Sequence, residues 1–364
     1  MGSVRSRDGR RVLPILRTSG VAREGYRRMR ILSYYPRALV GDGGPTLAAR
    51  GWARALADAG CEVRVACEAG PVTAQDERVS YVPLPHRGRG RLRWPVGIEE
   101  HLAWADVVHL HSAWVAHNAF VGRRARALRK PYVLVPHGGY EPNVLRRRAF
   151  AKRAWWRLVE ASLVHGAATV HVFFEGEVRH VRHLGFEGPV IIAPNGIDVP
   201  PHPLWDGGTG GYVLWMGRYD VEHKGLDLLV EALASLPATQ RPRVRLHGKD
   251  FGSGREAVKE LVRDAGLERW VEVLGPVYGT EKESALVRAK AFVYPSRWEA
   301  QGLAVLEALS AGVPCIVTST MMIAAEISQV GGAFVADPIP KSIVQALLLS
   351  AGRGAASVAA RGYA

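Results

Sequence analysis

The stretch Asp198-Val-Pro-Pro-His-Pro203 separates two parts of the chain that share one organisation. Its prolines fix φ and remove backbone donors, so it predicts a stiff linker rather than a helix or a paired strand. After it, short apolar runs predict strands at Tyr212–Met216, Val244–His247, Val271–Leu274, Ala291–Tyr294 and Pro314–Thr318. Between these runs, the spacing of apolar residues predicts helices at Leu226–Leu236, Arg255–Ala265, Glu281–Arg288 and Leu303–Ala311. This alternation is typical of a parallel sheet covered by helices on both faces.

The part before the linker shows the same alternation. Strands are predicted at Arg30–Tyr35, Val63–Cys67, Val107–Leu110, Tyr132–Val135, Thr169–Phe173 and Val190–Ala193. Helices are predicted at Thr46–Ala59, Leu145–Val164 and Glu175–Leu184. We therefore predict an α/β protein of two doubly wound, Rossmann-like domains, residues 29–200 and 204–364. Their ligands should bind in the cleft between the domains, at the carboxyl ends of the strands.

Composition and charge narrow the function. The chain has 364 residues, 48% of them hydrophobic and 23% charged, and it has three cysteines. No uncharged apolar stretch reaches the roughly 18 residues of a membrane span, and three scattered cysteines make no disulfide framework, so we predict a cytoplasmic protein. Residues 1–28 contain eight basic and two acidic residues without periodicity, which predicts either that this extension is flexible or that the native start is Met29.

The net charge of +14 lies entirely in residues 1–200, which hold 31 basic and 17 acidic side chains. Such asymmetry indicates an anionic partner. No helix-turn-helix or zinc-finger pattern accompanies the arginines, so we expect no nucleic acid. A phosphorylated acceptor, or peripheral contact with the inner face of a membrane, fits better.

The most informative motif runs from Tyr294 to Pro314, YPSRWEAQGLAVLEALSAGVP. Glycine interrupts the run, so we place Glu299 in a loop and begin the helix after it. The positive end of that helix should present free N–H groups to a phosphate, those of Gly302, Leu303 and Ala304. Glu299 and Glu307 would flank this point as acceptors for sugar hydroxyls. The alternative is that Glu299 is an N-cap and Glu307 a solvated side chain.

A second motif, Met216-Gly-Arg-Tyr-Asp-Val-Glu-His-Lys-Gly225, follows the first strand of the second domain. It places Arg218 and Lys224 at the carboxyl edge of the sheet, where phosphates bind. Arginine offers a planar fork and lysine a point charge, a combination suited to a diphosphate. Taken alone, two basic loop residues are more often solvated.

The first domain contributes two glycine-rich segments. Gly41-Asp-Gly-Gly44 joins the first strand to the first helix and fits a tight turn as well as a ligand loop. His137, in Val135-Pro-His-Gly-Gly139, lies just after a strand on the ligand edge. His109 and His111 resemble a metal-binding pair, but no further ligands are suitably spaced, so we predict no metal.

The predicted helix Leu145–Val164 carries six basic residues beside Trp155 and Trp156. We expect its tryptophans to pack into the first domain. The alternative is contact with an anionic interface.

Together these motifs resemble the retaining family-4 glycosyltransferases of the GT-B fold. The resemblance covers residues 29 to 337 in the right order. It rests on Gly43-Gly44, Asp106-Val-Val-His-Leu-His111, Pro136-His-Gly-Gly139, Pro194-Asn-Gly-Ile-Asp198, Gly217-Arg218 with Lys224-Gly225, and Glu299 with Glu307.

The resemblance implies that the second domain binds a UDP- or GDP-sugar and the first a sugar-containing acceptor, lipid-linked or phosphorylated. The reaction would be hexose transfer with retention, in the biosynthesis of a polysaccharide, lipid-linked oligosaccharide or natural-product glycoside. The implied catalytic set is His137, Glu299, Arg218 and Lys224. The implied donor-binding set is Gly43, Gly44, Arg218, Lys224, Gly248, Val277, Glu299, Gly302, Leu303, Ala304 and Glu307.

Within these sets, Glu307 would bind the ribose, and Arg218 with Lys224 would hold the diphosphate. Because these cations neutralise the leaving group, no metal or other cofactor is implied. Glu299 would grip the transferred sugar, which His137 would approach from the first domain. The base would lie near His247–Lys249 and Leu274–Val277.

Two departures from the family pattern affect these expectations. Gln301 stands where the family often has an aromatic residue, which leaves the sugar preference open. The chain ends at Ala364, before the terminal helix that in the family crosses back to the first domain, so we expect a truncated C-terminus. Two other functions stay open: a nucleotide-sugar epimerase of the same fold, and a non-catalytic protein that binds nucleotide-sugar or nucleic acid.

Overall fold

The computed structural model describes residues 27–39, 43–70, 76–89, 92–352 and 354–363. Of the predicted extension, only Arg27 and Arg28 are described, and Gly41 and Asp42 of the predicted glycine loop also lie outside the described residues. Arg27 forms an ion pair with Asp106 at 2.9 Å.

The first sheet has seven parallel strands in the order β3-β2-β1-β6-β7-β8-β9. Their bounds are β1 Arg30–Tyr35, β2 Glu62–Glu68, β3 Val79–Leu84, β6 Val107–His111, β7 Tyr132–Val135, β8 Thr169–Val172 and β9 Val190–Ile192. The chief helices around it are α1 Gly44–Asp58, α2 Ile98–Trp104, α3 Ala116–Ala127 and α7 Glu175–His183. A hairpin of β4 (His86–Arg89) and β5 (Leu92–Pro95) lies outside the sheet. Five of the six residues of β1 are buried, as expected for a strand covered on both faces.

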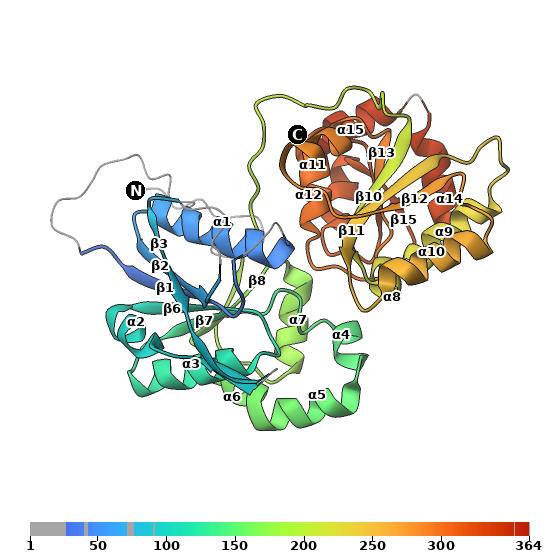
Figure 1. The fold of residues 1–364 in the computed structure, drawn as a ribbon. Coiled ribbons are helices and arrows are strands. Elements are labelled where there is room, and N and C mark those ends of the chain that lie inside the picture. The colour runs from blue at the N-terminus through green and yellow to red at the C-terminus, as the bar shows by residue number, and fades with distance from the viewer. Residues whose placement is uncertain (1–26, 40–42, 71–75, 90–91, 353, 364) are drawn as a thin grey trace, which may run out of the picture.

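The second sheet has six parallel strands in the order β12-β11-β10-β13-β14-β15. Their bounds are β10 Tyr212–Tyr219, β11 Arg243–Asp250, β12 Val271–Leu274, β13 Ala291–Tyr294, β14 Cys315–Thr318 and β15 Ala333–Ala336. Its helices are α8 Val221–Lys224, α9 Leu226–Ser235, α10 Gly254–Asp264, α11 Gly279–Val287, α12 Leu303–Ser310, α13 Ala324–Val330, α14 Pro340–Ser350 and α15 Ala355–Tyr363. Figure 1 shows two α/β units side by side, joined by a segment that runs outside both sheets.

In both sheets the strand order reverses beside the first strand. β1 lies between β2 and β6, and β10 lies between β11 and β13. Loops that leave neighbouring strands in opposite directions open a crevice at this point, which is where open α/β sheets bind ligands. The α/β prediction of two doubly wound, Rossmann-like sheets is therefore confirmed.

The single helix predicted at Leu145–Val164 is wrong. The segment consists of α4 Pro142–Arg146, α5 Ala149–Trp155, a π-helical turn η1 Trp156–Glu160, and α6 Ala161–His165. The chain breaks because Arg147 is extended, with ψ 118°, and Arg148 is left-handed, with φ 56°. The expected packing of the tryptophans holds for Trp156, which lies against the core of the first domain, whereas Trp155 lines a cavity.

Among the described residues, no single helix is long and apolar enough to cross a membrane. In the same described residues, α14 and α15 taken together reach that length and apolarity, with a 97° bend between them.

Candidate functional site

The centre of the candidate site is an ion pair between Lys224, in α8, and Glu299, in the loop before α12. The Lys224 side chain is 8% exposed and that of Glu299 is 17% exposed. Lys224 Nζ also donates to the hydroxyl of Tyr294 at 2.8 Å, and that hydroxyl lies 3.3 Å from Glu299 Oε2.

Both members of the pair are charged. Burial opposes ionisation of Glu299, but the charge of Lys224 outweighs it and holds the carboxyl pKa below its usual value. Burial likewise disfavours the charged Lys224, yet the carboxylate of Glu299 raises its pKa. Within the part of the chain that the structure describes, the polar contacts of the Glu299 carboxylate fall on Oε2, and Oε1 is available to another donor.

Local sequence places Lys224 at this point. Asp220 caps α8 by accepting from the backbone N–H of His223, at 3.4 Å. Gly225 then takes a left-handed conformation, with φ 61°, and ends the short helix. A Cβ at Gly225 would collide with the carbonyl oxygen of Pro295, so only glycine lets β13 and α8 approach so closely.

The start of α12 lies beside this pair. Gly302 has φ 72°, and a Cβ there would lie 3.3 Å from Cγ of Glu299. Among the described residues, none accepts a hydrogen bond from the N–H groups of Gly302, Leu303 or Ala304. From the first domain, Gly44 lies opposite, since a Cβ there would sit 3.8 Å from Cδ1 of Leu303, and Gly43 precedes it as the N-cap of α1. The helix tip therefore offers free donors in a cleft that both domains line.

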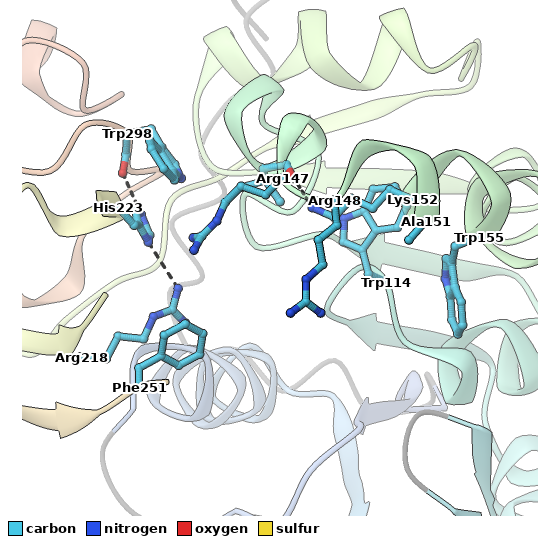
Figure 2. Close-up of a pocket in the computed structure, with 11 residues that line it drawn as sticks. Trp114, Arg147, Arg148, Ala151, Lys152, Trp155, Arg218, His223, Phe251 and Trp298 are labelled. Carbon is cyan, nitrogen blue, oxygen red and sulfur yellow. Dashed lines mark hydrogen bonds between the residues drawn. The ribbon is translucent and has the colours of Figure 1, made fainter. Parts of the chain in front are cut away.

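Arg218 joins the cluster through His223. Burial lowers the pKa of His223 to about 4, so its ring is neutral at pH 7. Its Nε2 lies 2.9 Å from the carbonyl oxygen of Trp298 and must carry the proton, which leaves Nδ1 to accept from Arg218 Nη2 at 3.3 Å. His223 also stacks on the Trp298 ring, with 4.7 Å between centroids. Arg218 is thus held with its charge toward the cleft, as Figure 2 shows.

His137 enters from the first domain at the end of a hydrogen-bonded chain. Its Nε2 lies 3.0 Å from Nδ1 of His111, whose Nε2 lies 3.1 Å from the hydroxyl of Ser33. His137 has φ 51°, and a Cβ on the next residue, Gly138, would lie 3.0 Å from that of Ala300. The His137 loop therefore packs directly against the Glu299 loop.

Glu307 lies in the second turn of α12 and forms an ion pair with Lys282 of α11 at 2.7 Å. It also lines a cavity of about 860 Å³ between α1 and α12, together with Leu303 and Arg54. Glu307, the residue predicted to bind the ribose, thus faces open space, but one of its carboxylate oxygens is already paired with Lys282.

Two further residues of the predicted donor set, Gly248 and Val277, lie in β11 and after β12. Gly248 pairs with Gly217 in the β10–β11 register, and a Cβ there would collide with the carbonyl oxygen of Gly217. Val277 follows β12 and packs against the core of the second domain. Gly248 therefore has a structural reason to be glycine, whatever it binds.

Gln301 does not face the cleft. It is 4% exposed, and its side-chain oxygen accepts from both the backbone and side-chain nitrogens of Asn195, at 2.8 and 2.7 Å. Its Nε2 donates to the Asn195 carbonyl at 2.7 Å. The residue that departs from the family pattern therefore links the two domains.

Two family models match the chain. The model described as "Glycosyl transferase 4-like domain" matches residues 43–196, and "Glycosyl transferases group 1" matches residues 208–349. The chain belongs to the family-4 glycosyltransferases.

Individual relatives agree with this family. The GDP-mannose:cellobiosyl-diphosphopolyprenol alpha-mannosyltransferase of Xanthomonas oryzae pv. oryzae is 24% identical over 248 residues, which is 67% of this chain and 64% of that protein. The match thus spans slightly less than two thirds of that relative.

Solved structures show the fold. Sucrose-phosphate synthase from Thermosynechococcus elongatus superposes with a TM-score of 0.73 at 18% identity, over 92% of this chain and 93% of that one. HepE from Anabaena in complex with UDP-glucose superposes with a TM-score of 0.72 at 16% identity, over 92% of this chain and 94% of that one. The predicted GT-B fold is confirmed.

The sequence reasoning missed several residues of this family-4 site. Tyr294, Asp220 and His223 lay inside the quoted motifs, but nothing in them showed that they touch Glu299 or Arg218. Arg147 was counted only as part of a basic helix, yet it bonds to Asp220 across the cleft at 3.1 Å.

No group of three or more metal-ligating side chains is arranged to hold a metal ion in the described part of the chain. Metal independence stays a prediction.

Proposed function

We propose that the chain transfers a hexose from a UDP- or GDP-sugar to a hydroxyl of a sugar-containing acceptor. The observation that carries this proposal is the Lys224–Glu299 pair beside the free N–H groups at the start of α12. A carboxylate for sugar hydroxyls and a set of donors for a diphosphate stand next to each other there.

The diphosphate is the leaving group. As the bond between the anomeric carbon and the diphosphate oxygen breaks, negative charge grows on that oxygen. Lys224, Arg218 and the N–H groups of α12 stabilise this charge. The acceptor oxygen forms the new bond to the anomeric carbon, and its proton passes to the leaving phosphate.

Glu299 holds the sugar rather than attacking it. Lys224 neutralises Oε2, which makes the carboxylate a poor nucleophile, while Oε1 can accept from sugar hydroxyls. With no covalent intermediate on Glu299, retention follows if the acceptor attacks from the face that the diphosphate leaves. The paired cations can supply this chemistry without a metal.

The relatives support either base. HepE was solved with UDP-glucose, and the Xanthomonas enzyme is named for GDP-mannose and a diphosphopolyprenol-linked acceptor. Biosynthesis of a surface polysaccharide or lipid-linked oligosaccharide fits both.

Peripheral membrane contact is part of the proposal. Phe150 in α5 and Leu158 in η1 are 84% and 81% exposed. Arg146, Arg153 and Arg157 in the same segment are exposed too. Apolar side chains among arginines suit the interface of an anionic bilayer.

The test is a thermal-shift screen of UDP- and GDP-sugars, followed by NMR analysis of the product with the preferred donor. We expect one donor to raise Tm by mass action and the product to keep the donor's anomeric configuration. Glu299→Gln should abolish most turnover, whereas Glu231→Gln, on an exposed face of α9, should not. An epimer plus free nucleotide without acceptor would instead indicate the epimerase, and full activity of Glu299→Gln would refute the assignment.

A further inference from the structure

A cavity of about 490 Å³ lies between α4–α5 of the first domain and the β10–α8 region of the second. Four of its eleven lining residues are basic, and none is acidic: Arg147, Arg148, Lys152 and Arg218. Figure 2 shows the Arg148 side chain extending into the space between Phe251 and Trp114. The cavity therefore combines positive charge with aromatic walls.

The aromatic wall is built around a buried carboxylate. Glu160 is fully buried and accepts from the backbone N–H of Trp114 at 2.9 Å and from the indole N–H of Trp155 at 3.3 Å. Tyr140 donates to the same carboxyl at 2.8 Å. The bond to Glu160 orients the Trp155 indole, and the Trp114 indole N–H donates to the carbonyl oxygen of Gly139 at 2.7 Å. This part of the wall is therefore formed before any ligand arrives.

The charge of the cavity is only partly neutralised. Arg147 and Arg218 share the carboxylate of Asp220, at 3.1 and 3.6 Å. Lys152 donates to the carbonyl oxygen of Val144 and lies over the Trp114 ring, with 5.5 Å to its centroid.

Arg148 has neither an ion pair nor a side-chain hydrogen bond within the described residues. It also sits at the left-handed break of the chain, with φ 56°. Such strain persists where neighbouring structure holds it, often at ligand clamps.

We propose that this cavity binds an acceptor that is itself a sugar phosphate, with Arg148 and Arg147 on the phosphate and the tryptophan wall against the sugar. This proposal rests on the proposed transferase function. A planar guanidinium fork matches phosphate oxygens, and flat indole rings suit the apolar face of a sugar. A neutral sugar would leave the positive charge of the cavity uncompensated.

The position fits the reaction. Arg218 and His223 line one side of the cavity and belong to the donor cluster described above. An acceptor phosphate at Arg148 would hold the acceptor sugar between the cavity and that cluster. The phosphate can belong to a soluble sugar phosphate or to a sugar joined to a lipid through a diphosphate, because both offer the same phosphate chemistry.

The test is calorimetric titration of the full chain with UDP or GDP present to fill the donor diphosphate site. The probes are α-glucose 1-phosphate and methyl α-glucoside. We expect the phosphate probe to bind at least about tenfold more tightly, because one charge-assisted bond contributes that much. Arg148→Gln should weaken binding of the phosphate probe about tenfold, and Arg148→Lys should weaken it less. Arg146 lies on α4 outside the cavity, so Arg146→Gln should leave this affinity unchanged.

Titration of UDP or GDP alone separates the two proposals. Unchanged nucleotide affinity in Arg148→Gln supports a separate acceptor subsite, and an equal loss would assign the cavity to the donor and overturn the inference. Equal affinity for the two sugar probes would overturn it as well. If the wild-type chain binds the sugar phosphate but no nucleotide, the transferase proposal fails while the cavity assignment stands. Comparing a polyprenyl diphosphate sugar in detergent with glucose 1-phosphate identifies the source of the phosphate. Tighter binding of the polyprenyl compound indicates a lipid-linked acceptor, and equal binding of the two indicates a soluble one.

Discussion

Lys224 and Glu299, which lie 75 residues apart in the chain, form one largely buried ion pair that the hydroxyl of Tyr294 joins. Lys224 comes from the short helix after β10, and Glu299 from the loop after β13. Their meeting places a cation next to the free donors of α12. The candidate site therefore depends on how the sheet aligns these segments.

Breaking this pair should cost both stability and activity. In Glu299→Leu, Lys224 keeps its hydrogen bond to Tyr294 but is left as a buried cation without a counter-ion, and we expect a loss of about 3–5 kcal/mol in the free energy of unfolding. Adding Lys224→Met should restore much of that stability by removing the charge, but it should not restore turnover. Urea unfolding and initial rates check the two effects separately. A double variant that regains activity would contradict the proposed roles.

Stability should fall in mild acid. Burial lowers the pKa values of His109 and His137 to about 3 and that of His223 to about 4, against 6.5 in the unfolded chain. Between about pH 6.5 and pH 4 the unfolded chain therefore binds more protons, and the free energy of unfolding falls as the pH falls. Each histidine contributes up to about 1.4 kcal/mol per pH unit.

Urea unfolding between pH 7.5 and 5 measures this slope. Nδ1 of His109 has no hydrogen-bond partner among the described residues, so His109→Phe removes one titrating group without breaking a bond there. The slope of the free energy of unfolding against pH should be smaller in this variant by the amount that corresponds to about one proton. A slope equal to that of the wild type would show that His109 does not stay neutral in the folded state.

The Ser33–His111–His137 chain should set the tautomer of His137. Within the described part of the chain, His111 is the hydrogen-bond partner of the Ser33 hydroxyl. If that hydroxyl donates to Nε2 of His111, Nδ1 of His111 donates to Nε2 of His137, whose proton then sits on Nδ1. Ser33→Ala should lower kcat by about tenfold with little change in KM, and Ser33→Thr should retain activity. ¹⁵N NMR of the imidazoles reports the tautomer, and an unaltered spectrum in Ser33→Ala would show that Ser33 does not set the tautomer of His137.

Gln301 should stabilise the arrangement of the domains seen in this structure. Gln301→Ala leaves buried donors and an acceptor of Asn195 unpaired, at a cost of about 1–3 kcal/mol. We expect a larger radius of gyration by small-angle X-ray scattering, together with reduced turnover. Gln240→Ala, at an exposed position, is the matched control. An unchanged radius would mean that other contacts hold the domains together.

The exposed side chains of α5 and η1 should bind anionic membranes. Replacing Phe150 and Leu158 with serine should reduce co-sedimentation with vesicles that contain phosphatidylglycerol, because both side chains are more than 80% exposed. Vesicles of phosphatidylcholine alone should bind little of either protein. Equal binding of wild type and variant would assign the contact to another surface.

Much of the site could be predicted from local sequence. Gly302 marked the start of α12, and Glu299 was placed in the loop before it. Arg218 and Lys224 were placed on a loop at the carboxyl edge of the sheet, whereas in the structure Arg218 lies in β10 and Lys224 in α8. This works because apolar spacing and glycine positions depend on neighbouring residues in the chain. The break at Arg148 was not predictable in this way, because a left-handed arginine has no local signature and is held by contacts around it.

The sequence by itself determined the alternation of strands and helices on both sides of the linker and the two-domain α/β class, because these follow from periodicity, and its motifs resembled those of the family. Only the tertiary structure decided which side chains meet across the cleft. Gln301 contacts Asn195 and Arg147 contacts Asp220, pairs that lie 106 and 73 residues apart. Such partners depend on the placement of both sheets, and no spacing within either segment encodes it.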